Sequence, residues 1–373
     1  MSGWWRHVLG DLRALLLPGE EAGQALPVMD GAWTPNRGLD EARPLGAALP
    51  GADDLADDGA GGLLISAGNL VWQCGGEDLN TRRVYAELPG EAGALARVGD
   101  ALYVGVAGCG LLKLDASGHE IARLAAVDGR PLDCVTALAA LPDGRLAIAQ
   151  GSAHHPPARW CHDLMEKRAS GRVVVAAADL AQATTLKDGL AWPAGVLARD
   201  DGKALWVSES WRHAVHRLAL DGRTTPLLAN LPGYPARLSD DGAGGVWLAL
   251  MAARTQLVEL VLREREYREE MLATIDPRYW IAPSLQATGH YLEPLQGGAL
   301  KKLGVIKPWA PPRSYGLIAR LAADGTPLAS LHSRAGGVHH GVLSVRALGG
   351  RVLAVSKGSG RVLALASGRE ETA

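Results

Sequence analysis

The sequence predicts an all-β protein, a six-bladed β-propeller with an N-terminal helix and a partly helical insertion in the fifth blade. The main observation is a loose repeat in which a glycine-containing turn precedes a short apolar strand. Six such units begin at Gly62, Asp100, Gly144, Lys203, Gly245 and Gly350. Their spacing of roughly 40–60 residues fits four-stranded blades, which stack in a ring because one blade cannot cover both of its faces.

Two further observations support this fold. Several of the six strands are followed by a second apolar run that ends at an Asp-Gly type turn, at residues 111–118, 215–222 and 317–325. The 47 glycines and 21 prolines are also typical of a chain with many turns. Strand, turn and strand therefore alternate along most of the sequence.

Charge and cysteine content exclude several classes of function. The chain has 38 Lys and Arg against 40 Asp and Glu, and a net charge of -2 leaves no basic surface for nucleic acid. The four cysteines include no CxxC pair, so neither a disulfide scaffold nor a zinc ribbon is indicated. We expect a small-molecule substrate as the partner and no nucleic acid.

Residues 1–45 are expected to form an N-terminal amphipathic helix and a connector. Apolar side chains recur at helical spacing between Trp5 and Leu16. This stripe predicts a helix that packs on the main domain or, alternatively, docks on a membrane surface or a transporter partner. The sequence has neither a long apolar run nor a signal-peptide pattern, so we expect a cytoplasmic protein.

Residues 46–373 are expected to form the propeller, with an insertion at about 256–313. The interval from Gly242 to Gly350 is about twice the others, so extra chain must lie within it. Residues 256–280 carry apolar positions among charges and favour helix. Long loops inside compact domains are usually functional, and we place this one across one end of the central channel.

The polar candidates lie beside the predicted inner strands, which border the central channel of a propeller. Asp53 and Asp54 precede the first strand and suit a hard cation such as calcium, or form a solvated acidic turn. Glu209 ends an apolar strand and is a candidate general base, or else a buried partner of Arg212 or His213.

Two adjacent imidazoles are the other acid/base candidates. His339 and His340 follow Gly336 and Gly337 and precede the last inner strand. Imidazole is the commonest general base near neutral pH, and flanking glycines allow a ligand to approach closely. One of the two is expected to face the pocket.

Four runs at 189–196, 206–210, 231–235 and 245–249 resemble the strictosidine-synthase-like family of six-bladed propellers. Its wider relatives are gluconolactonase, regucalcin and paraoxonase-type propellers, which hydrolyse lactones and esters around a central calcium. The resemblance implies a propeller with its pocket at one end of the axis. It does not settle the reaction, because one fold hosts many activities.

The departures from that pattern bear on the calcium. Asp53 or Asp54 matches the first acidic ligand of the hydrolytic relatives, but Ala194, Ala236 with Arg237, and Thr136 stand where later oxygen ligands are expected. Alanine and arginine side chains offer no oxygen. Strictosidine synthase itself needs no metal and uses a glutamate near the start of the last blade, where this chain has Ser344.

We therefore expect a strictosidine-synthase-like enzyme that acts on a small organic substrate in the axial pocket by metal-independent acid/base chemistry, of condensation or lyase type, with no cofactor. The expected catalytic residues are Glu209, His339 and His340. The expected substrate-binding residues are Trp192, His213, Tyr234, Arg237, Ser344 and Thr136. One alternative is a calcium-assisted lactone or ester hydrolase that uses Asp53 and Asp54, and the other is a non-catalytic metabolite-binding module.

Overall fold

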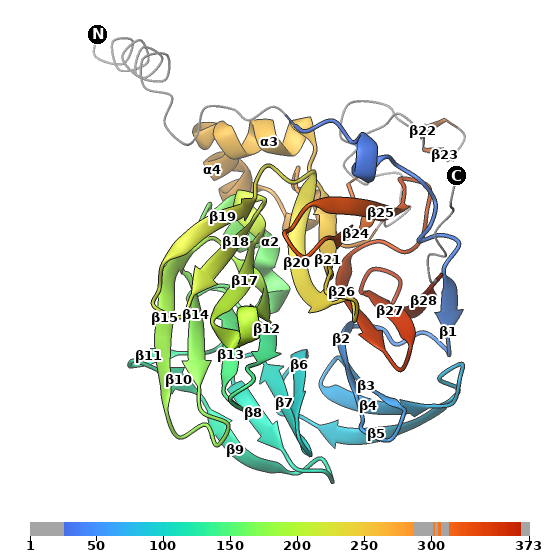
Figure 1. Cartoon of the computed structure of the whole chain (residues 1–373). Coiled ribbons are helices and arrows are strands. Elements are labelled where there is room, and N and C mark those ends of the chain that lie inside the picture. The colour runs from blue at the N-terminus through green and yellow to red at the C-terminus, as the bar shows by residue number, and fades with distance from the viewer. Residues whose placement is uncertain (1–25, 287–300, 303–304, 307–312, 367–373) are drawn as a thin grey trace.

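The computed structural model describes residues 26–286, 301–302, 305–306 and 313–366. Six four-stranded antiparallel sheets form a closed ring, which confirms the predicted six-bladed β-propeller (Figure 1). Within each of the first five blades the strands follow one another outward from the axis in chain order. The predicted N-terminal helix falls in residues 1–25, which lie outside the described residues.

The strands of the blades have the following bounds. Blade 1 contains β2 (Ala52–Asp57), β3 (Leu63–Ala67), β4 (Leu70–Gly75) and β5 (Thr81–Glu87). Blade 2 contains β6 (Ala92–Val98), β7 (Ala101–Val106), β8 (Gly110–Leu114) and β9 (Glu120–Leu124). Blade 3 contains β12 (Val135–Ala140), β13 (Leu146–Gln150), β14 (Gly171–Ala176) and β15 (Ala183–Leu190). Blade 4 contains β16 (Pro193–Arg199), β17 (Ala204–Glu209), β18 (Ala214–Ala219) and β19 (Thr224–Leu228). Blade 5 contains β20 (Gly233–Asp240), β21 (Val246–Ala253), β24 (Gly316–Leu321) and β25 (Pro327–Ser333). Blade 6 contains β26 (Val342–Leu348), β27 (Arg351–Ser356), β28 (Arg361–Leu365) and β1 (Arg43–Leu45).

Blade 6 closes the ring with strands from both ends of the propeller sequence. β1 pairs antiparallel with β28, so that Arg43 lies opposite Ala364 and Leu45 opposite Val362. Before it reaches β1, the connector runs along blade 5, where Ser330 Oγ donates to Ala32 O at 2.7 Å and His332 N donates to Asn36 Oδ1 at 3.1 Å. The connector therefore bridges blades 5 and 6.

The remaining elements are short. Two ribbons pair β10 (Ala126–Val127) with β11 (Arg130–Pro131) and β22 (Lys301–Lys302) with β23 (Val305–Ile306). The helices are η1 (Gly31–Trp33), η2 (Pro157–Arg159), α2 (Trp160–Met165), η3 (Asp200–Gly202), η4 (Ser210–Arg212), α3 (Gln256–Arg263), α4 (Arg265–Thr274) and η5 (Pro277–Tyr279). Within the described residues, none of them is both long and apolar enough to cross a membrane.

The two ends of the propeller differ in how their loops are built. At one end, here called the turn end, short turns join the first strand of a blade to the second and the third to the fourth. At the opposite end, here called the insertion end, lie the loops between second and third strands and between blades. The helices α3 and α4 stand between β21 and β24, which pair in one sheet, so the insertion belongs to the fifth blade as predicted.

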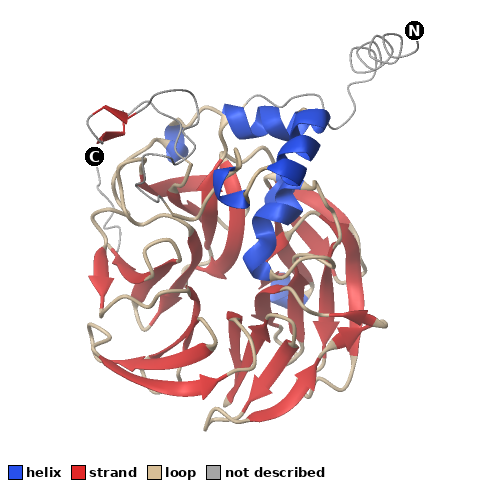
Figure 2. Ribbon diagram, turned by 180° about the vertical axis from the view of Figure 1, so that it is seen from behind, coloured by secondary structure: helices blue, strands red, loops and turns tan. Residues whose placement is uncertain are grey.

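The insertion contacts loops of several blades at the insertion end. The Trp280 and His162 rings lie 4.7 Å apart, which joins the insertion to α2 of blade 3. A Cβ at Gly341 or Gly358 would lie 2.5 or 2.1 Å from Leu285 O, so the insertion also packs closely on two glycine loops of blade 6. In Figure 2 the α-helices lie in front of the strands, on this side of the ring. The described part of the insertion thus contacts blades 3 and 6 at this end of the propeller.

Apolar side chains fill the interfaces between blades. Between blades 1 and 2, for example, Leu64, Leu95, Val104 and Leu112 are almost fully buried. A strand buried on both faces needs apolar residues at consecutive positions, which is why the second strand β13 of blade 3 is richer in Leu, Ile and Ala than the outer strand β5. The polar residues of the axis described below are therefore exceptions within an apolar body.

Candidate functional site

The inner strand of each blade is irregular where it begins, at the insertion end. In β2, β6, β12, β16, β20 and β26 the register with the neighbouring strand shifts within the first four residues. Such bulges turn side chains that regular alternation would direct away from the axis, and they are common next to functional sites. No sequence signal marked them.

The bulge in β2 brings two consecutive carboxylates to the axis. Ala52 pairs with Ala67 and Leu55 with Ile65, so Asp53 and Asp54 together face a single residue of β3. Both are buried, with exposed fractions of 6% and 0%. A buried carboxylate requires a cation or several hydrogen-bond donors, and this site supplies both.

Asp53 binds two cationic side chains. Its Oδ1 accepts from Arg237 Nη2 at 2.5 Å and its Oδ2 accepts from Lys357 Nζ at 2.8 Å. Lys357 Nζ also donates to Glu91 Oε1 at 3.1 Å. Arg237, which we expected to bind substrate, instead has its guanidinium held by contacts within the protein.

Asp54 is bound still more completely. Arg346 Nη2 donates to its Oδ2 at 3.0 Å, and the Ser344 hydroxyl donates to its Oδ1 at 2.6 Å. The backbone N–H of Leu95 donates to Oδ2 at 3.0 Å, and Arg237 Nε lies 3.5 Å from that oxygen. We call these six charged residues the hub: Asp53, Asp54, Glu91, Arg237, Arg346 and Lys357. Three carboxylates thus face three cations.

The electrostatics of the hub keep its groups ionised. Burial alone would raise the pKa of Asp53, but Lys357 and Arg237 outweigh it and hold that pKa well below its ordinary value. Burial opposes ionisation of Asp54 in the same way, and Arg346 and Arg237 lower its pKa. Burial would lower the pKa of Lys357, but Asp53 and Glu91 raise it.

The hub does not fit a calcium ion as it stands. Calcium takes six to eight oxygen ligands from carboxylates, carbonyls and water. Here both carboxylates are already bound by cationic side chains, and Ala194 and Ala236 offer no side-chain oxygen. Among the described residues there is no group of three or more His, Cys, Asp or Glu placed to hold a metal.

An aromatic cluster lies next to the hub, formed by Trp160, Trp192, Trp211, His213 and Tyr234. Trp192 stacks on Trp211 with ring centroids 5.1 Å apart, and Trp211 in turn lies 6.2 Å from Trp160 and 6.0 Å from Tyr234. Trp192 has a left-handed φ of 54°, which is costly for a bulky residue and is found mainly at functional sites.

Gly151 connects the aromatic cluster to the hub. A Cβ at this position would lie 2.7 Å from Thr136 Cγ2 and 3.1 Å from the Trp192 ring, so the two side chains meet across the glycine. The carbonyl oxygen of Thr136 accepts from Arg237 Nε at 2.9 Å. Thr136 therefore links Trp192 to Arg237 of the hub.

Tyr234 places an unusual hydroxyl inside the aromatic cluster. Its side chain is fully buried, and its Oη has no hydrogen-bond partner among the described residues. Burial raises the pKa of this phenol well above its ordinary value, so it stays protonated. A buried hydroxyl without a partner is costly, which makes it a candidate to bind a polar ligand atom.

Glu209 supports the turn that carries Trp192. Its Oε2 accepts from the backbone N–H of Ala191 at 2.8 Å and from Arg212 Nη1 at 2.6 Å, while His216 Nε2 lies 3.2 Å from Oε1. Burial would raise the pKa of Glu209, but these partners lower it. The contacts favour a buried ion pair over the predicted general base.

His213 is likewise tied to a neighbour rather than open to the axis. Its Nε2 lies 3.5 Å from Glu259 Oε1, and Glu259 also pairs with Arg254 at 3.1 Å. Burial lowers the pKa of His213. Because Glu259 lies on α3, this group of three fastens the insertion to blades 4 and 5.

The two predicted imidazoles lie at the insertion end with different partners. His340 Nε2 lies 2.9 Å from Arg334 O, so this nitrogen must donate, and Nδ1 then accepts from the Ser314 hydroxyl at 2.8 Å. His339 Nδ1 lies 3.2 Å from Ser359 Oγ, and burial lowers the pKa of His339. His339 therefore faces the loop that also carries Lys357.

Two residues predicted to bind substrate have contacts within the protein. Ser344 donates to Asp54, as described above. The Thr136 hydroxyl donates to Pro193 O at 2.5 Å and thereby joins the inner strands of blades 3 and 4. These contacts favour a structural role for both hydroxyls.

Sequence reasoning missed half of the hub. Lys357, Arg346 and Glu91 were not among the expected residues, although Lys357 directly follows the apolar strand β27 as Ser210 follows β17. A comparison of the residues after each second strand would have selected this lysine together with Arg254, which follows β21. Nothing in the sequence around Arg346 or Glu91 marks them.

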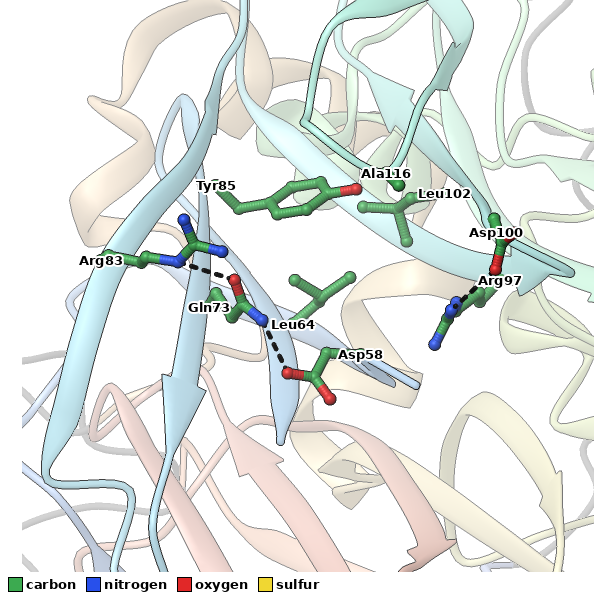
Figure 3. Close-up of a pocket in the computed structure, with 9 residues that line it drawn as sticks. All are labelled: Asp58, Leu64, Gln73, Arg83, Tyr85, Arg97, Asp100, Leu102 and Ala116. Atoms are coloured by element: carbon green, nitrogen blue, oxygen red, sulfur yellow. Dashed lines mark hydrogen bonds and ion pairs between the residues drawn. The ribbon is translucent and has the colours of Figure 1, made fainter. Parts of the chain in front are cut away.

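A hollow lies at the turn end, between blades 1 and 2 (Figure 3). Its polar side chains bind one another: Gln73 Nε2 donates to Asp58 at 2.7 Å and Gln73 Oε1 accepts from Arg83 at 2.9 Å. Tyr85 Oη donates to Asp115 O at 2.6 Å. These polar groups already have partners, unlike the phenol of Tyr234.

Comparison with known proteins finds similar sequences in two fishes. No model of a protein family matches the chain. It is 25% identical to adipocyte plasma membrane-associated protein of Salmo salar over half of either sequence, and 23% identical to the Danio rerio protein of that name over 70% of this chain and 71% of the relative. The chain thus spans only half the length of the first of these relatives.

Solved structures show the same fold. A gluconolactonase from Xanthomonas campestris superposes with a TM-score of 0.55 at 14% identity, over 86% of this chain and 87% of that one. A calcium-binding regucalcin from Agrobacterium tumefaciens superposes with a TM-score of 0.51 at 14% identity, over 87% of this chain and 91% of that one. The chain is a six-bladed propeller of the gluconolactonase and regucalcin type in architecture.

Proposed function

We propose that this chain is an enzyme that acts, without a metal ion, on a small organic substrate bound at the insertion end. One observation carries the proposal: an ionic hub, an aromatic cluster and two buried imidazoles meet at the same end of the axis, beneath the insertion. Apolar surroundings with a few fixed polar groups are typical of small-molecule sites.

The arrangement suggests the kind of substrate. Trp160 and Trp211 are partly exposed and offer a flat apolar surface. Lys357 and Glu91 keep exposed side-chain fractions of 21% and 34% and offer a polar surface at the hub. A molecule with an aromatic or other flat apolar body and one polar group would match both.

We assign the role of general base to His339. Burial lowers the pKa of His339, so the ring is neutral at pH 7, as a base must be. His340, whose two ring nitrogens are bound by Ser314 and Arg334, is assigned a positioning role for the loop. Glu209 is assigned a positioning role for Trp192, because it holds the N–H of Ala191.

A turnover screen tests this proposal. The panel contains aryl esters, lactones, and arylethylamines offered together with aldehydes, each with and without EDTA. For any substrate that is turned over, His339→Gln should lower kcat by about 100-fold or more, which is the usual contribution of a general base. The matched control is His119→Gln, an exposed histidine at the turn end, which should leave kcat unchanged.

Three outcomes would contradict the proposal. Equal kcat values for the two variants would remove His339 from the reaction. Loss of turnover in EDTA with recovery in calcium would establish the calcium-assisted hydrolase instead. A ligand that raises Tm but is never converted would support the non-catalytic binding module.

The predicted membrane or transporter contact of the N-terminal segment is a separate proposal. That segment lies outside the described residues, and the support is the name of the matched relatives, which are called plasma membrane-associated. Deletion of residues 1–20 should then reduce the share of the protein in the membrane fraction of cells. An unchanged distribution would contradict the contact, and the cytoplasmic location remains a prediction.

A further inference from the structure

The surroundings of the Arg237 guanidinium consist of oxygen atoms. It contacts Asp53 Oδ1 at 2.5 Å, Asp53 O at 2.8 Å and Thr136 O at 2.9 Å, and its Nε lies 3.5 Å from Asp54 Oδ2. Two carboxylates and two carbonyls thus converge on one buried positive charge. The side chain has an exposed fraction of only 9%.

This donor set is the one that a hard divalent cation takes, since calcium binds carboxylate and carbonyl oxygens. The oxygens come from blades 1 and 3, and the cation that joins them comes from β20 of blade 5. Because guanidinium remains charged at all relevant pH values, the hub holds this charge permanently.

We infer that the Arg237 guanidinium is a built-in substitute for a divalent cation at the hub, and that removal of this side chain opens a calcium site. The inference shares the hub with the proposed function but does not otherwise depend on it. It concerns cation binding and stability, and it can be tested without knowledge of the substrate.

The neighbouring cations Lys357 and Arg346 limit the calcium affinity that we expect for a variant without the Arg237 side chain. Lys357 would still bind Asp53 Oδ2 and Arg346 would still bind Asp54, so a calcium ion would find only part of the carboxylate charge available. We therefore expect weak binding, with a Kd on the order of 10⁻⁴–10⁻³ M, as in other weak calcium sites. The wild-type protein should bind no calcium in this range.

The experiment measures calcium binding by isothermal titration and Tm in CaCl₂ and in EGTA. The variants are Arg237→Ala, which removes the cation, and Arg237→Gln, which keeps more of the volume and adds an amide oxygen. The matched control is Arg217→Ala. Arg217 also pairs with an aspartate, Asp200, but this pair is exposed to solvent at the turn end. A double variant, Arg237→Ala with Asp53→Asn, removes the negative charge of one of the proposed calcium ligands.

The inference predicts that calcium leaves the Tm of wild type and Arg217→Ala unchanged. In EGTA, Arg237→Ala should lose about 5 °C or more, because the two buried carboxylates lose the cation that they share. Calcium should restore part of that loss, and the double variant should not respond. Calcium binding by wild type would overturn the inference, as would an Arg237→Ala variant that is destabilised and indifferent to calcium.

The inference remains testable if a variant fails to fold. If Arg237→Ala is insoluble, Arg237→Gln provides the same readings. If neither variant folds in EGTA but calcium present during expression and refolding recovers either one, the inference is supported. If calcium recovers neither, it is overturned. A negative screen for turnover would leave these outcomes unaffected, so this inference and the proposed function can fail separately.

Discussion

The two ends of the propeller are built by different means. At the turn end, aspartates accept hydrogen bonds from nearby backbone: Asp115 from Ser117 N at 2.8 Å, Asp221 from Arg223 N at 3.0 Å and Asp324 from Thr326 N at 2.9 Å. At the insertion end, the contacts join distant parts of the chain, such as Asp54 with Arg346, which are 292 positions apart. The turn end therefore depends on contacts between residues close in sequence, and the insertion end depends on contacts that form when the ring closes.

This difference has a consequence for stability. The turns are exposed and repeated, so each can be lost with little effect on the rest. The carboxylates Asp53 and Asp54 of the hub are buried, and the hub is shared among blades 1, 2, 5 and 6, so each of its charges depends on a partner from another blade. Identical substitutions at the two ends should therefore have very different effects.

The largest contrast is expected for an Asp→Asn substitution made at each end. Asp54→Asn should lower the free energy of unfolding by about 3–5 kcal/mol, because Arg346 and Arg237 would lose a buried counter-charge. Asp200→Asn, which breaks the exposed pair with Arg217, should cost less than about 1 kcal/mol. Urea unfolding of both variants measures the difference, and similar losses would remove the distinction between the two ends.

The fold could be predicted from the sequence because the turn end repeats a local signal. Asp221 accepts a hydrogen bond from Arg223 N within its own turn, so the residues that determine this turn lie within a few positions of one another. The doubled interval between Gly242 and Gly350 likewise located the insertion. Propensity and spacing are sufficient wherever a contact lies within a few residues.

The candidate site could be predicted only in part. Asp53 and Asp54 stood out as adjacent carboxylates, but their cations lie 184 to 304 positions away, and no local pattern connects them. The pairing of Glu209 with Arg212 was foreseen as an alternative because the two are three residues apart. Long-range pairing depends on how the ring closes, which the sequence of one blade does not reveal.

A buried histidine near the insertion end gives the next largest effect. His332 lies between the hydroxyls of Tyr315, at 3.0 Å, and Ser330, at 2.7 Å. Burial lowers its pKa to about 4, below the unfolded value near 6.5. The unfolded chain then binds the proton more readily, so stability is full above about pH 6.5 and falls as the pH drops toward 4.

The expected loss over that interval is about 3 kcal/mol. Unfolding of wild type and His332→Gln in urea at pH 7, 5.5 and 4 measures it. The wild-type advantage over the variant should shrink on acidification. A constant difference across the three pH values would show that the imidazole does not titrate in this way.

The ion pair that fastens the insertion should have a somewhat smaller effect. Burial would raise the pKa of Glu259, but His213 and Arg254 lower it to about 2, while the unfolded value is near 4.3. The pair therefore contributes fully above about pH 5, and its contribution is lost as the pH falls toward 2. Glu259→Gln should cost about 2–3 kcal/mol at pH 7.

The matched control for this substitution is Glu269→Gln on α4, where the carboxylate pairs with Arg265 at an exposed surface. That variant should behave as wild type at every pH. Proteolysis within residues 256–286 gives a second reading, because the insertion should be cut faster once Glu259 is neutral. Equal cleavage of all three proteins would contradict the fastening role.

The smallest effect is expected in the turns themselves. Asp221→Ala removes the side-chain acceptor of one exposed turn at the turn end, but leaves the backbone bond from Gly222 N to Ala219 O at 2.9 Å. The urea midpoint should stay within the error of the measurement. A loss as large as that of Asp54→Asn would mean that the turns, and not the hub, hold the ring together.

The central claim is that ligands bind at the insertion end and not at the turn end. Crystals of the wild-type protein soaked with a library of small aromatic fragments carrying one polar group test it directly. The account predicts fragments against Trp211 and Lys357, beneath the insertion. Fragments that collect instead in the hollow around Gln73 and Tyr85, with the insertion end unoccupied in every soak, would contradict it.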